Sequence, residues 1–552
     1  MSDVRIGVFI CHCGTNIGGF LDILAIVEYA KTLPNVSFVQ NNLYTCSEVG
    51  LAEIRKNVKE FNLNRVVVAS CSPRTHEPLF RATCSEAGLN PYLFEMVNIR
   101  DQCSWVHMKE REKATEKAKD LIKMGVSKAA LIQPLEKIRV NVNSSALIIG
   151  GGVAGMTAAL NLANQGFNVF LVEKEPELGG LIKNLNQIYP DNEQASKYLE
   201  KIIQEVKKNA KIKIFKSSTV VKIEGFIGNY KAVVKSAKQS VDIEAGAVIL
   251  ATGASAFTPK GLYGYNGKTI ITQLELEQLL KKGNFHAQNI AMIQCVGVRN
   301  EERNYCSNIC CMSAIKNATI LKDQNPSANI CILFRDIQTQ GTLYEDYYRN
   351  AREKGILFIK YLPEKAPVVK KKNVEVYNDF LNQEINIPCD LIVLSTPLVA
   401  NEDAVEIAKM LKVPVQENNF FLEAHVKLRP VDFATDGIFV CGSAHWPADI
   451  SESVSQAYAA ASRASTIISK SYLEVEGSTA EVNNDLCVGC EVCVKLCPYK
   501  AISRNDEDRI VVNKVLCKSC GVCGASCPHN AIIIHHFTSE QVLSEINSYG
   551  GC

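Results

Sequence analysis

Eight cysteines near the C-terminus repeat one spacing twice, and this repeat constrains the fold more than any other feature. Each copy has three cysteines at intervals of three residues and a fourth that precedes proline: Cys487, Cys490, Cys493 and Cys497, then Cys517, Cys520, Cys523 and Cys527. Three closely spaced thiolates can bind one 4Fe-4S cube, and the cysteine before proline ligates the other cluster. We therefore predict two ligand sets: Cys487, Cys490, Cys493 with Cys527, and Cys517, Cys520, Cys523 with Cys497.

This repeat is the pattern of bacterial ferredoxins. A pair of structural zinc sites is the alternative, but zinc sites rarely combine eight cysteines with a cysteine-proline crossover. The chain has 22 cysteines, and Asp3 and Arg5 precede its first apolar stretch, which is not typical of a secretion signal. Because thiols stay reduced in the cytosol, we expect metal-bound thiolates in a cytoplasmic protein of an anaerobic or microaerobic host.

Charge and hydropathy exclude some classes of partner. The chain has 60 basic and 58 acidic residues, so we expect no binding to nucleic acid. Its most apolar run, residues 146–163, is interrupted by four glycines, so we expect no membrane insertion. The patterns divide the 552 residues into an N-terminal α/β domain (1–140), a middle domain (141–475) and a ferredoxin-like domain (476–552).

The first segment alternates short apolar strands (5–10, 36–41, 65–70 and 92–98) with amphipathic helices (21–31 and 48–61), which predicts a small parallel α/β layer. The carboxyl ends of such strands share one edge, where ligands bind. Four cysteines follow these strands: Cys11, Cys13, Cys46 and Cys71. They are candidate ligands of a further cluster, with Cys103 in reserve. The alternative is free buried cysteine, which we expect for Cys84 on its helix.

The middle segment opens with a complete dinucleotide-binding fingerprint. Strand 146–149 leads into the glycine-rich turn 150–155, helix 156–165 and a second strand that ends before Glu173. We expect Gly150 to make the tight turn, Gly152 to admit the pyrophosphate to the helix N-terminus and Gly155 to allow close helix packing. Glu173 would bind the ribose hydroxyls.

Two later segments, 248–253 and 437–442, resemble the strand-then-glycine segments of flavoproteins of the thioredoxin reductase type, with two dinucleotide domains. The resemblance implies FAD, and it adds four residues to the cofactor site: Gly180, Gly253, Gly442 and Ser443. Those flavoproteins usually have an acid where this chain has Ser443, so the contact with the ribityl chain differs here.

The expected nicotinamide loop is replaced by cysteines. Strand 290–294 runs into Cys295 without a second glycine-rich fingerprint, and three more thiols follow closely: Cys306, Cys310 and Cys311. A redox-active dithiol is the alternative, but a disulfide between adjacent cysteines closes a strained ring. We favour a further iron-sulfur cluster, which would replace the nicotinamide as electron partner of the flavin.

Taken together, these motifs resemble the A-subunit family of heterodisulfide reductases. They occur in order along nearly the whole chain: residues 11–14 (Cys-His-Cys-Gly), 68–78, the flavin loop, the Cys295 group and the ferredoxin repeat. The resemblance implies an oxidoreductase subunit with FAD and four 4Fe-4S clusters, with a cluster at the N-terminal cysteines and one at the Cys295 group. It also implies that Lys316 lies near the flavin as a catalytic residue.

By the same resemblance, the chain passes electrons between a two-electron partner and one-electron carriers by flavin-based bifurcation or confurcation. The implied partners are B- and C-type subunits, a hydrogenase, formate dehydrogenase or NADH-oxidising module, and ferredoxin, around a homodimer of this chain. Alternatives are an NAD(P)H-dependent flavoprotein reductase with a ferredoxin tail, similar to the small subunit of glutamate synthase, and a non-bifurcating electron-transfer scaffold.

The chain departs from the family pattern at one place. Many members carry an inserted ferredoxin domain soon after the glycine pair that here is Gly179-Gly180, but residues 181–241 contain no cysteine. One electron outlet of the longer relatives is therefore missing, and we identify the chain as a short form of the family.

Overall fold

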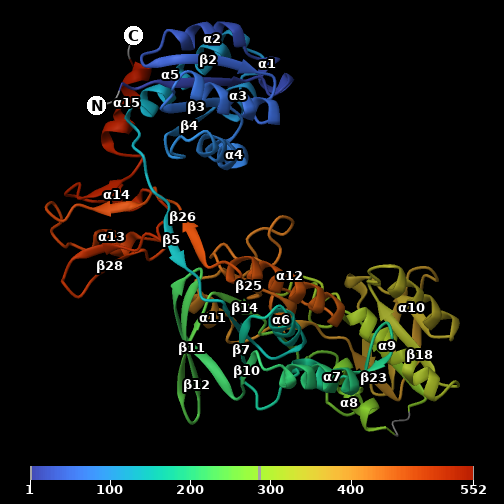
Figure 1. The fold of residues 1–552 in the computed structure, drawn as a ribbon. Helices are drawn as coiled ribbons and strands as arrows, with labels where there is room; N and C mark the ends of the chain where they lie inside the picture. The colour runs from blue at the N-terminus through green and yellow to red at the C-terminus, as the bar shows by residue number, and fades with distance from the viewer. Residues whose placement is uncertain (1–2, 284–286, 551–552) are drawn as a thin grey trace. The chain divides into compact units, whose positions relative to one another are not determined.

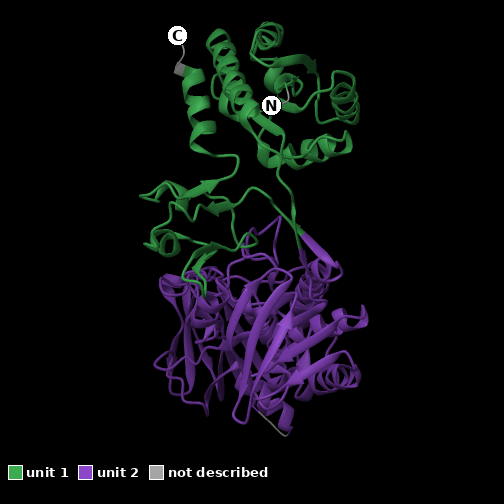
Figure 2. Ribbon diagram, turned by 60° about the vertical axis from the view of Figure 1, so that its left-hand side comes forward, with its two compact units in different colours: residues 1–139, 474–552 green, residues 140–473 purple. Residues whose placement is uncertain are grey.

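The computed structural model describes residues 3–283 and 287–550, which form two compact units. One unit combines the described residues up to Arg139 with those from Glu474 onward, and the other contains Val140–Leu473 (Figure 2). The chain passes between the units within β5 (Ile138–Asn141) and β26 (Tyr472–Val475). These points lie close to the domain joints expected near residues 140 and 475.

The N-terminal part of the first unit is a parallel sheet covered by helices. Its strand order is β2-β1-β3-β4. The strands are β1 (Ile6–Cys11), β2 (Val36–Asn42), β3 (Arg65–Ser70) and β4 (Phe94–Asn98). The helices are α1 (Thr15–Gly18), α2 (Ile23–Lys31), α3 (Glu48–Glu60), α4 (Pro73–Glu86) and α5 (Arg111–Leu131), with a π-helical turn at Arg100–Ser104. The predicted α/β layer is confirmed, and β1 and β3 are buried almost throughout.

The fourth strand begins at Phe94, two residues later than predicted. Leu93 donates its N–H to the carbonyl of Asn90, so the chain is still in a turn at Tyr92. The Tyr92 hydroxyl donates to Glu476 (3.0 Å) and accepts from the N–H of Gly477 (2.7 Å). The position of Tyr92 thus depends on residues from the far end of the chain.

The C-terminal part of the first unit consists of two short strand pairs, two short helices and a terminal helix. Its elements are β27 (Ala480–Val482), α13 (Val492–Leu496), β28 (Ile502–Arg504), β29 (Ile510–Val512), α14 (Val522–Ala525), β30 (Ile532–Ile534) and α15 (Ser539–Gly550). β27 pairs with β30 and β28 pairs with β29, both antiparallel. Helix α15 lies beside α5 (Figure 1), where the Gln541 amide donates to the carbonyl of Leu131 (3.2 Å).

The second unit contains two parallel sheets. The first has the order β10-β7-β6-β14-β25: β6 (Ser145–Ile149), β7 (Asn168–Val172), β10 (Ile212–Phe215), β14 (Ala247–Leu250) and β25 (Ile438–Val440). Alanine-rich helices α6 (Val153–Asn164) and α12 (Ile450–Ile468) pack together on this sheet, because their small side chains permit close approach. Helix α7 (Ala195–Lys208) lies next to α6 (Figure 1).

The second parallel sheet has the order β16-β23-β17-β18-β19: β16 (Ile270–Thr272), β17 (Asn289–Ile293), β18 (Asn329–Phe334), β19 (Leu357–Lys360) and β23 (Leu391–Leu394). Its helices are α8 (Gln273–Lys282), α9 (Cys310–Gln324) and α10 (Thr342–Glu353). Two parallel sheets of this kind are the two dinucleotide domains that the sequence predicts.

Smaller antiparallel elements complete the second unit. Two are three-stranded sheets: β11 (Ser218–Phe226), β12 (Asn229–Ser236) and β13 (Ser240–Ala245), and β20 (Val368–Lys370), β21 (Asn373–Asn378) and β22 (Gln383–Pro388). Two are strand pairs: β8 (Gln187–Ile188) with β9 (Glu193–Gln194), and β15 (Ala254–Ala256) with β24 (Leu398–Ala400). Helix α11 (Ala404–Leu411) also belongs to this unit. Within the described part of the chain, each helix is too short or too polar to cross a lipid bilayer.

Candidate functional site

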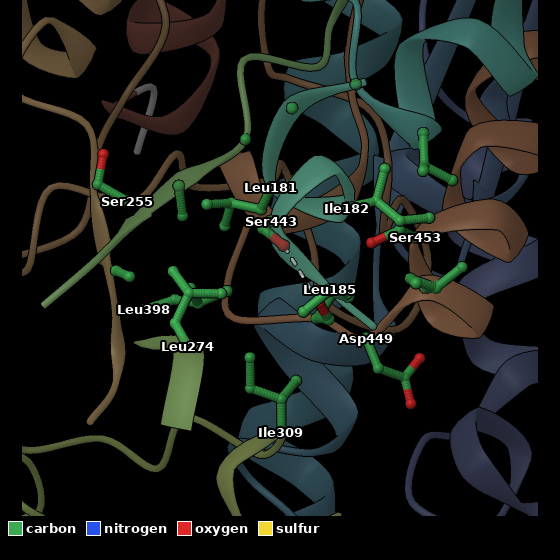
Figure 3. A pocket seen from close by; sticks show the side chains of 18 of the residues that line it. Leu181, Ile182, Leu185, Ser255, Leu274, Ile309, Leu398, Ser443, Asp449 and Ser453 are labelled. Atoms are coloured by element: carbon green, nitrogen blue, oxygen red, sulfur yellow. Dashed lines mark hydrogen bonds between the residues drawn. The ribbon is translucent and has the colours of Figure 1, made fainter. Parts of the chain in front are cut away.

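A cavity of about 460 Å³ opens in the second unit at the carboxyl ends of β6 and β14. Apolar side chains such as Leu181, Leu274 and Leu398 surround it together with the polar Ser443 and Asp449 (Figure 3). Seven of the residues predicted for the flavin site line it: Gly150, Gly152, Glu173, Gly180, Gly253, Lys316 and Ser443. Gly155 and Gly442 lie behind this wall rather than on it.

The glycine-rich turn after β6 has the shape that a dinucleotide requires. Gly150 has a φ of 112°, and a side chain there would clash with the carbonyl of Ala251. A side chain at Gly155 would clash with the carbonyl of Gly150, so this glycine permits α6 to approach the strand end. Both glycines are therefore required by the backbone; Gly150 also lines the cavity, whereas the effect of Gly155 on the cavity is indirect.

Gly152, by contrast, faces free space. No atom lies within 4 Å of the position that a Cβ of Gly152 would occupy, and the same holds for Gly253. Gly152 is the N-cap of α6, and no side chain caps the helix there. The first N–H groups of α6 thus remain available to an anion, and the helix dipole favours negative charge at the same point. This end of the cavity fits a pyrophosphate.

Glu173 is held in place by backbone groups. Its carboxylate accepts from the N–H of Gly151 (2.6 Å) and from the N–H of Glu175 (2.8 Å), and its side chain is buried. Each carboxylate oxygen has a second lone pair. A ribose hydroxyl could donate to one of these positions.

Ser443 and Asp449 also line the cavity. The Ser443 hydroxyl donates to the carbonyl of Ala448 (3.1 Å; Figure 3). Asp449 accepts from the Tyr344 hydroxyl (2.6 Å) and from the N–H of Glu452 (2.8 Å), so it also caps α12. The sequence interpretation omitted Asp449, although an acid directly before a helix is an N-cap signal.

Lys316 lines the cavity from α9 and forms an ion pair with Glu277 of α8. Each side chain is only 2% exposed. Lys316 also donates to the carbonyl of Gln187 (2.7 Å), and Glu277 accepts from the N–H of Asn186 (2.9 Å). Burial lowers the pKa of Lys316, and the charge of Glu277 opposes this shift. Glu277 was not predicted, because no sequence pattern links it to Lys316.

The four thiols of the Cys295 group surround a second, small cavity. Cys295, Cys306, Cys310 and Cys311 all line it, although they come from the loop after β17 and from the first turn of α9. The N–H of Asn308 donates to the sulfur of Cys306 (3.4 Å). Cys310 lines both this cavity and the large one, so it separates them.

The electrostatics of these thiols disfavour a redox dithiol. Burial raises the pKa of the Cys311 thiol to about 12 and raises that of Cys310 further. A reactive dithiol needs a cysteine with a lowered pKa, since the thiolate is the nucleophile. Metal binding removes the thiol protons directly and does not need such a shift. Four thiols around one void therefore fit a cluster.

The C-terminal cysteines surround two further small cavities. One is lined by Cys487, Cys490, Cys493 and Cys527, and the other by Cys497, Cys517, Cys520 and Cys523. The cysteine before proline thus lies with the other triplet in both cases. Backbone N–H groups donate to three of these sulfurs: Ala480 to Cys517 (3.4 Å), Ala501 to Cys497 (3.3 Å) and Ala531 to Cys527 (3.3 Å).

The N-terminal cysteines gather at the carboxyl edge of their sheet. The sulfur of Cys11 accepts from the N–H of Cys13 (3.2 Å) and of Thr45 (3.4 Å). Burial raises the pKa of Cys46 and of Cys71, and the neighbouring charges of Cys11 and Cys13 raise both further. The four thiols are therefore electrostatic neighbours, as expected at such an edge.

Two other cysteines of this domain lie elsewhere. Cys103 donates to the carbonyl of Ala114 (3.0 Å), and Cys84 on α4 has no exposed surface. Both belong to the apolar core of the domain. The sequence expectation for Cys84 as a packing residue agrees with this burial.

Among the described residues, no three Cys, His, Asp or Glu side chains meet at a point suited to a single metal ion. The cysteine groups with cavities instead place their sulfurs around a void. Sulfurs spread around a void suit the faces of an iron-sulfur cube, which is larger than one ion.

Two family models match the chain. Residues 144–293 match the pyridine nucleotide-disulphide oxidoreductase family, and residues 486–531 match the 4Fe-4S dicluster domain. The predicted fold class is thus confirmed: a flavoprotein core with two dinucleotide domains, an N-terminal parallel α/β domain and a C-terminal ferredoxin domain with two 4Fe-4S clusters.

Several curated proteins are similar over most of the chain. An iron-sulfur A subunit of the CoB--CoM heterodisulfide reductase of Methanopyrus kandleri is 38% identical, with 91% of this chain and 92% of that protein covered. The A subunit of the H(2):CoB-CoM heterodisulfide,ferredoxin reductase of Methanothermobacter thermautotrophicus is 37% identical over 646 residues, with 99% of this chain and 98% of that protein covered. Because 646 exceeds the 552 residues of this chain, the relative contains stretches that this chain lacks.

Among solved structures, the thioredoxin reductase of Lactococcus lactis is 20% identical to this chain. The match covers 59% of this chain and 99% of that protein, with a TM-score of 0.42.

Proposed function

Because this chain belongs to the A-subunit family of heterodisulfide reductases, we propose that it is the FAD and iron-sulfur electron-transfer subunit of a heterodisulfide reductase-like complex. In this role it passes electrons between a two-electron partner and one-electron carriers, by flavin-based bifurcation or confurcation. The chain is an oxidoreductase with 4Fe-4S clusters. The number of clusters, the flavin chemistry and the partners are parts of the proposal.

The observation that carries the proposal is the position of Cys310. This one residue lines both the large cavity and the cavity of the Cys295 group. A cluster held there would lie next to the FAD, without an intervening nicotinamide site. Bound FAD supplies the exchange between electron pairs and single electrons, and the protein supplies position and charge.

We assign the binding roles as follows. The N–H groups at the start of α6, opened by Gly152, hold the pyrophosphate, and Glu173 accepts from the ribose. Gly180 and Gly253 let the backbone approach the cofactor, whereas Gly155 and Gly442 support the wall behind it. Lys316 is the catalytic residue, since its ammonium group can stabilise negative charge that develops on the flavin ring.

Sixteen cysteines hold four 4Fe-4S clusters in this proposal. The N-terminal cluster is bound by Cys11, Cys13, Cys46 and Cys71, and the flavin-proximal cluster by Cys295, Cys306, Cys310 and Cys311. The remaining two clusters occupy the cavities of the ferredoxin repeat.

The names of the relatives support the proposal of a multi-subunit complex. One belongs to an H(2):CoB-CoM heterodisulfide,ferredoxin reductase, and another to an H(2)/formate:CoB-CoM heterodisulfide,ferredoxin reductase. We propose B- and C-type subunits, a hydrogenase, formate dehydrogenase or NADH-oxidising module, and ferredoxin as partners in the cytoplasm, with this chain as a homodimer. Heterodisulfide reduction itself would occur on a separate subunit.

The direct test is to purify the chain without oxygen and to measure iron and acid-labile sulfide per FAD. Four clusters predict about sixteen irons per flavin, at four per cluster. About eight irons, with cluster loss excluded, would leave only the ferredoxin pair and would contradict the proposal. Rapid bleaching of the flavin by NADH in the isolated chain would favour a stand-alone reductase.

A further inference from the structure

Arg299 places a positive charge beside a sulfur of the Cys295 group. Its Nη1 lies 4.0 Å from the sulfur of Cys295, and its Nη2 pairs with the carboxylate of Asp336 at 2.8 Å. Arg335 donates to the carbonyl of Arg299 (3.0 Å), which anchors the loop from the other side. Because a guanidinium stays protonated at any physiological pH, this charge is permanent.

The N-terminus of α9 adds positive potential at the same cavity. Cys310 and Cys311 are the first two residues of this 15-residue helix. Its first turn contains no acidic residue, and no side chain caps it. The partial positive charge of a helix N-terminus, about half an elementary charge, therefore acts on these two sulfurs.

The N-terminal cysteine group has the same arrangement. Nη1 of Arg100 lies 3.8 Å from the sulfur of Cys13, and the guanidinium stacks on the ring of Trp105 at 4.6 Å. Both cysteine groups outside the ferredoxin repeat thus have an arginine beside a sulfur. Because the same contact occurs in both groups, we expect the positive charge to act on the group that the cysteines bind.

We propose that Arg299 raises the reduction potential of the cluster held by the Cys295 group and so favours transfer of a single electron from the flavin to that cluster. This inference rests on the proposed function. Reduction adds one electron, and hence one negative charge, to the cluster, while the flavin loses that electron. A nearby positive charge stabilises the reduced form, since cluster potentials depend on local charge and hydrogen bonds to sulfur.

The test compares Arg299→Gln, Arg299→Lys and Asp336→Asn in the full chain, purified without oxygen, with Cys306→Ala as the reference that identifies the cluster signal. A redox titration followed by electron paramagnetic resonance gives the midpoint potential of each cluster. The signal of interest is the one that disappears in Cys306→Ala. Arg299→Gln should lower the equilibrium constant for reduction about tenfold, which is about 59 mV for one electron. Arg299→Lys should stay near the parent.

Asp336→Asn is the matched control. It removes the negative partner of the same ion pair, so it should shift the potential upward, opposite to Arg299→Gln. If the ion pair only fixed the loop, both variants would shift the potential in the same direction, and the inference would be wrong. An unchanged potential in Arg299→Gln would also overturn it.

The iron content separates this inference from the proposed function. If Cys306→Ala loses about four irons, the cluster exists, and the potentials alone decide the role of Arg299. If Cys306→Ala loses neither iron nor a signal, the Cys295 group holds no cluster. The proposed function and this inference would then both be overturned.

Discussion

Lys316 and Glu277 form an ion pair in which both side chains are almost fully buried, at the wall of the large cavity. Two helices supply the pair: α9 carries the lysine and α8 the glutamate. A buried charge is costly unless it is paired and hydrogen-bonded. The carbonyl of Gln187 and the N–H of Asn186 supply the additional hydrogen bonds.

We expect the two partners to affect the flavin in opposite directions. Lys316→Met leaves the Glu277 carboxylate without its cation, which disfavours a negatively charged reduced flavin and lowers its potential. Glu277→Gln leaves the ammonium charge uncompensated and raises the potential. Anaerobic titration against reference dyes measures both shifts. Unchanged flavin potentials in the two variants would exclude a role for Lys316 in tuning the flavin.

The same pair predicts non-additive stability. Either Glu277→Gln or Lys316→Met alone should destabilise the second unit by about 3 kcal/mol, because each leaves a buried charge unpaired. The double variant Lys316→Met with Glu277→Met should lose much less than the sum. Denaturant unfolding of the FAD-loaded protein, followed by flavin release, measures these differences. Additive losses would indicate that the two charges do not interact.

Substitutions at two glycines of the glycine-rich turn should have different effects, one on FAD binding and the other on stability. Gly152→Ala should leave the fold intact, because free space surrounds the new Cβ, but it should weaken FAD binding at the entrance to α6. Gly155→Ala should destabilise the unit itself, since its Cβ clashes with the carbonyl of Gly150. Flavin content and the thermal midpoint of the FAD-free protein distinguish the two effects. A folded, flavin-free Gly155→Ala variant would contradict this division.

In the ferredoxin repeat, each cysteine that precedes proline lies with the triplet of the other copy, and this predicts which cysteine variants lose the same cluster signal. Cys527→Ser should remove the same cluster signal as Cys490→Ser, whereas Cys497→Ser should remove the signal lost in Cys520→Ser. Each variant should lose about four irons. Paramagnetic resonance of the dithionite-reduced protein tests the pairing. Cys84→Ser is the control, since its buried side chain lies in the apolar core and should not change the iron content.

The sequence predicts those parts of the site in which the bound cofactor dictates the spacing of the residues along the chain. The two ferredoxin ligand sets follow from spacing alone, because the cube requires three close thiolates and one distant thiolate. The flavin turn is recognisable for a similar reason, since strand, glycines, helix and acid must follow in order. Both belong to short stretches whose geometry is nearly independent of the rest of the chain.

The residues that sequence patterns do not reveal depend on tertiary packing. Glu277 meets Lys316 only because α8 packs against α9, and nothing in the sequence near either residue indicates this. Arg299 lies within the Cys295 motif. The direction of its side chain, however, depends on its backbone φ of 58° and on its ion pair with Asp336, which follows β18. Hydrophobic periodicity carries no information about such side-chain directions.

The two ends of the chain meet in the first unit, and this has a consequence for synthesis. Helix α5 lies in the first quarter of the sequence, yet its partner α15 is the last helix to be made. The Gln541–Leu131 hydrogen bond therefore cannot form while the ribosome is still adding the ferredoxin residues. The second unit is complete much earlier. A nascent chain thus has time to receive its flavin before the first unit can close.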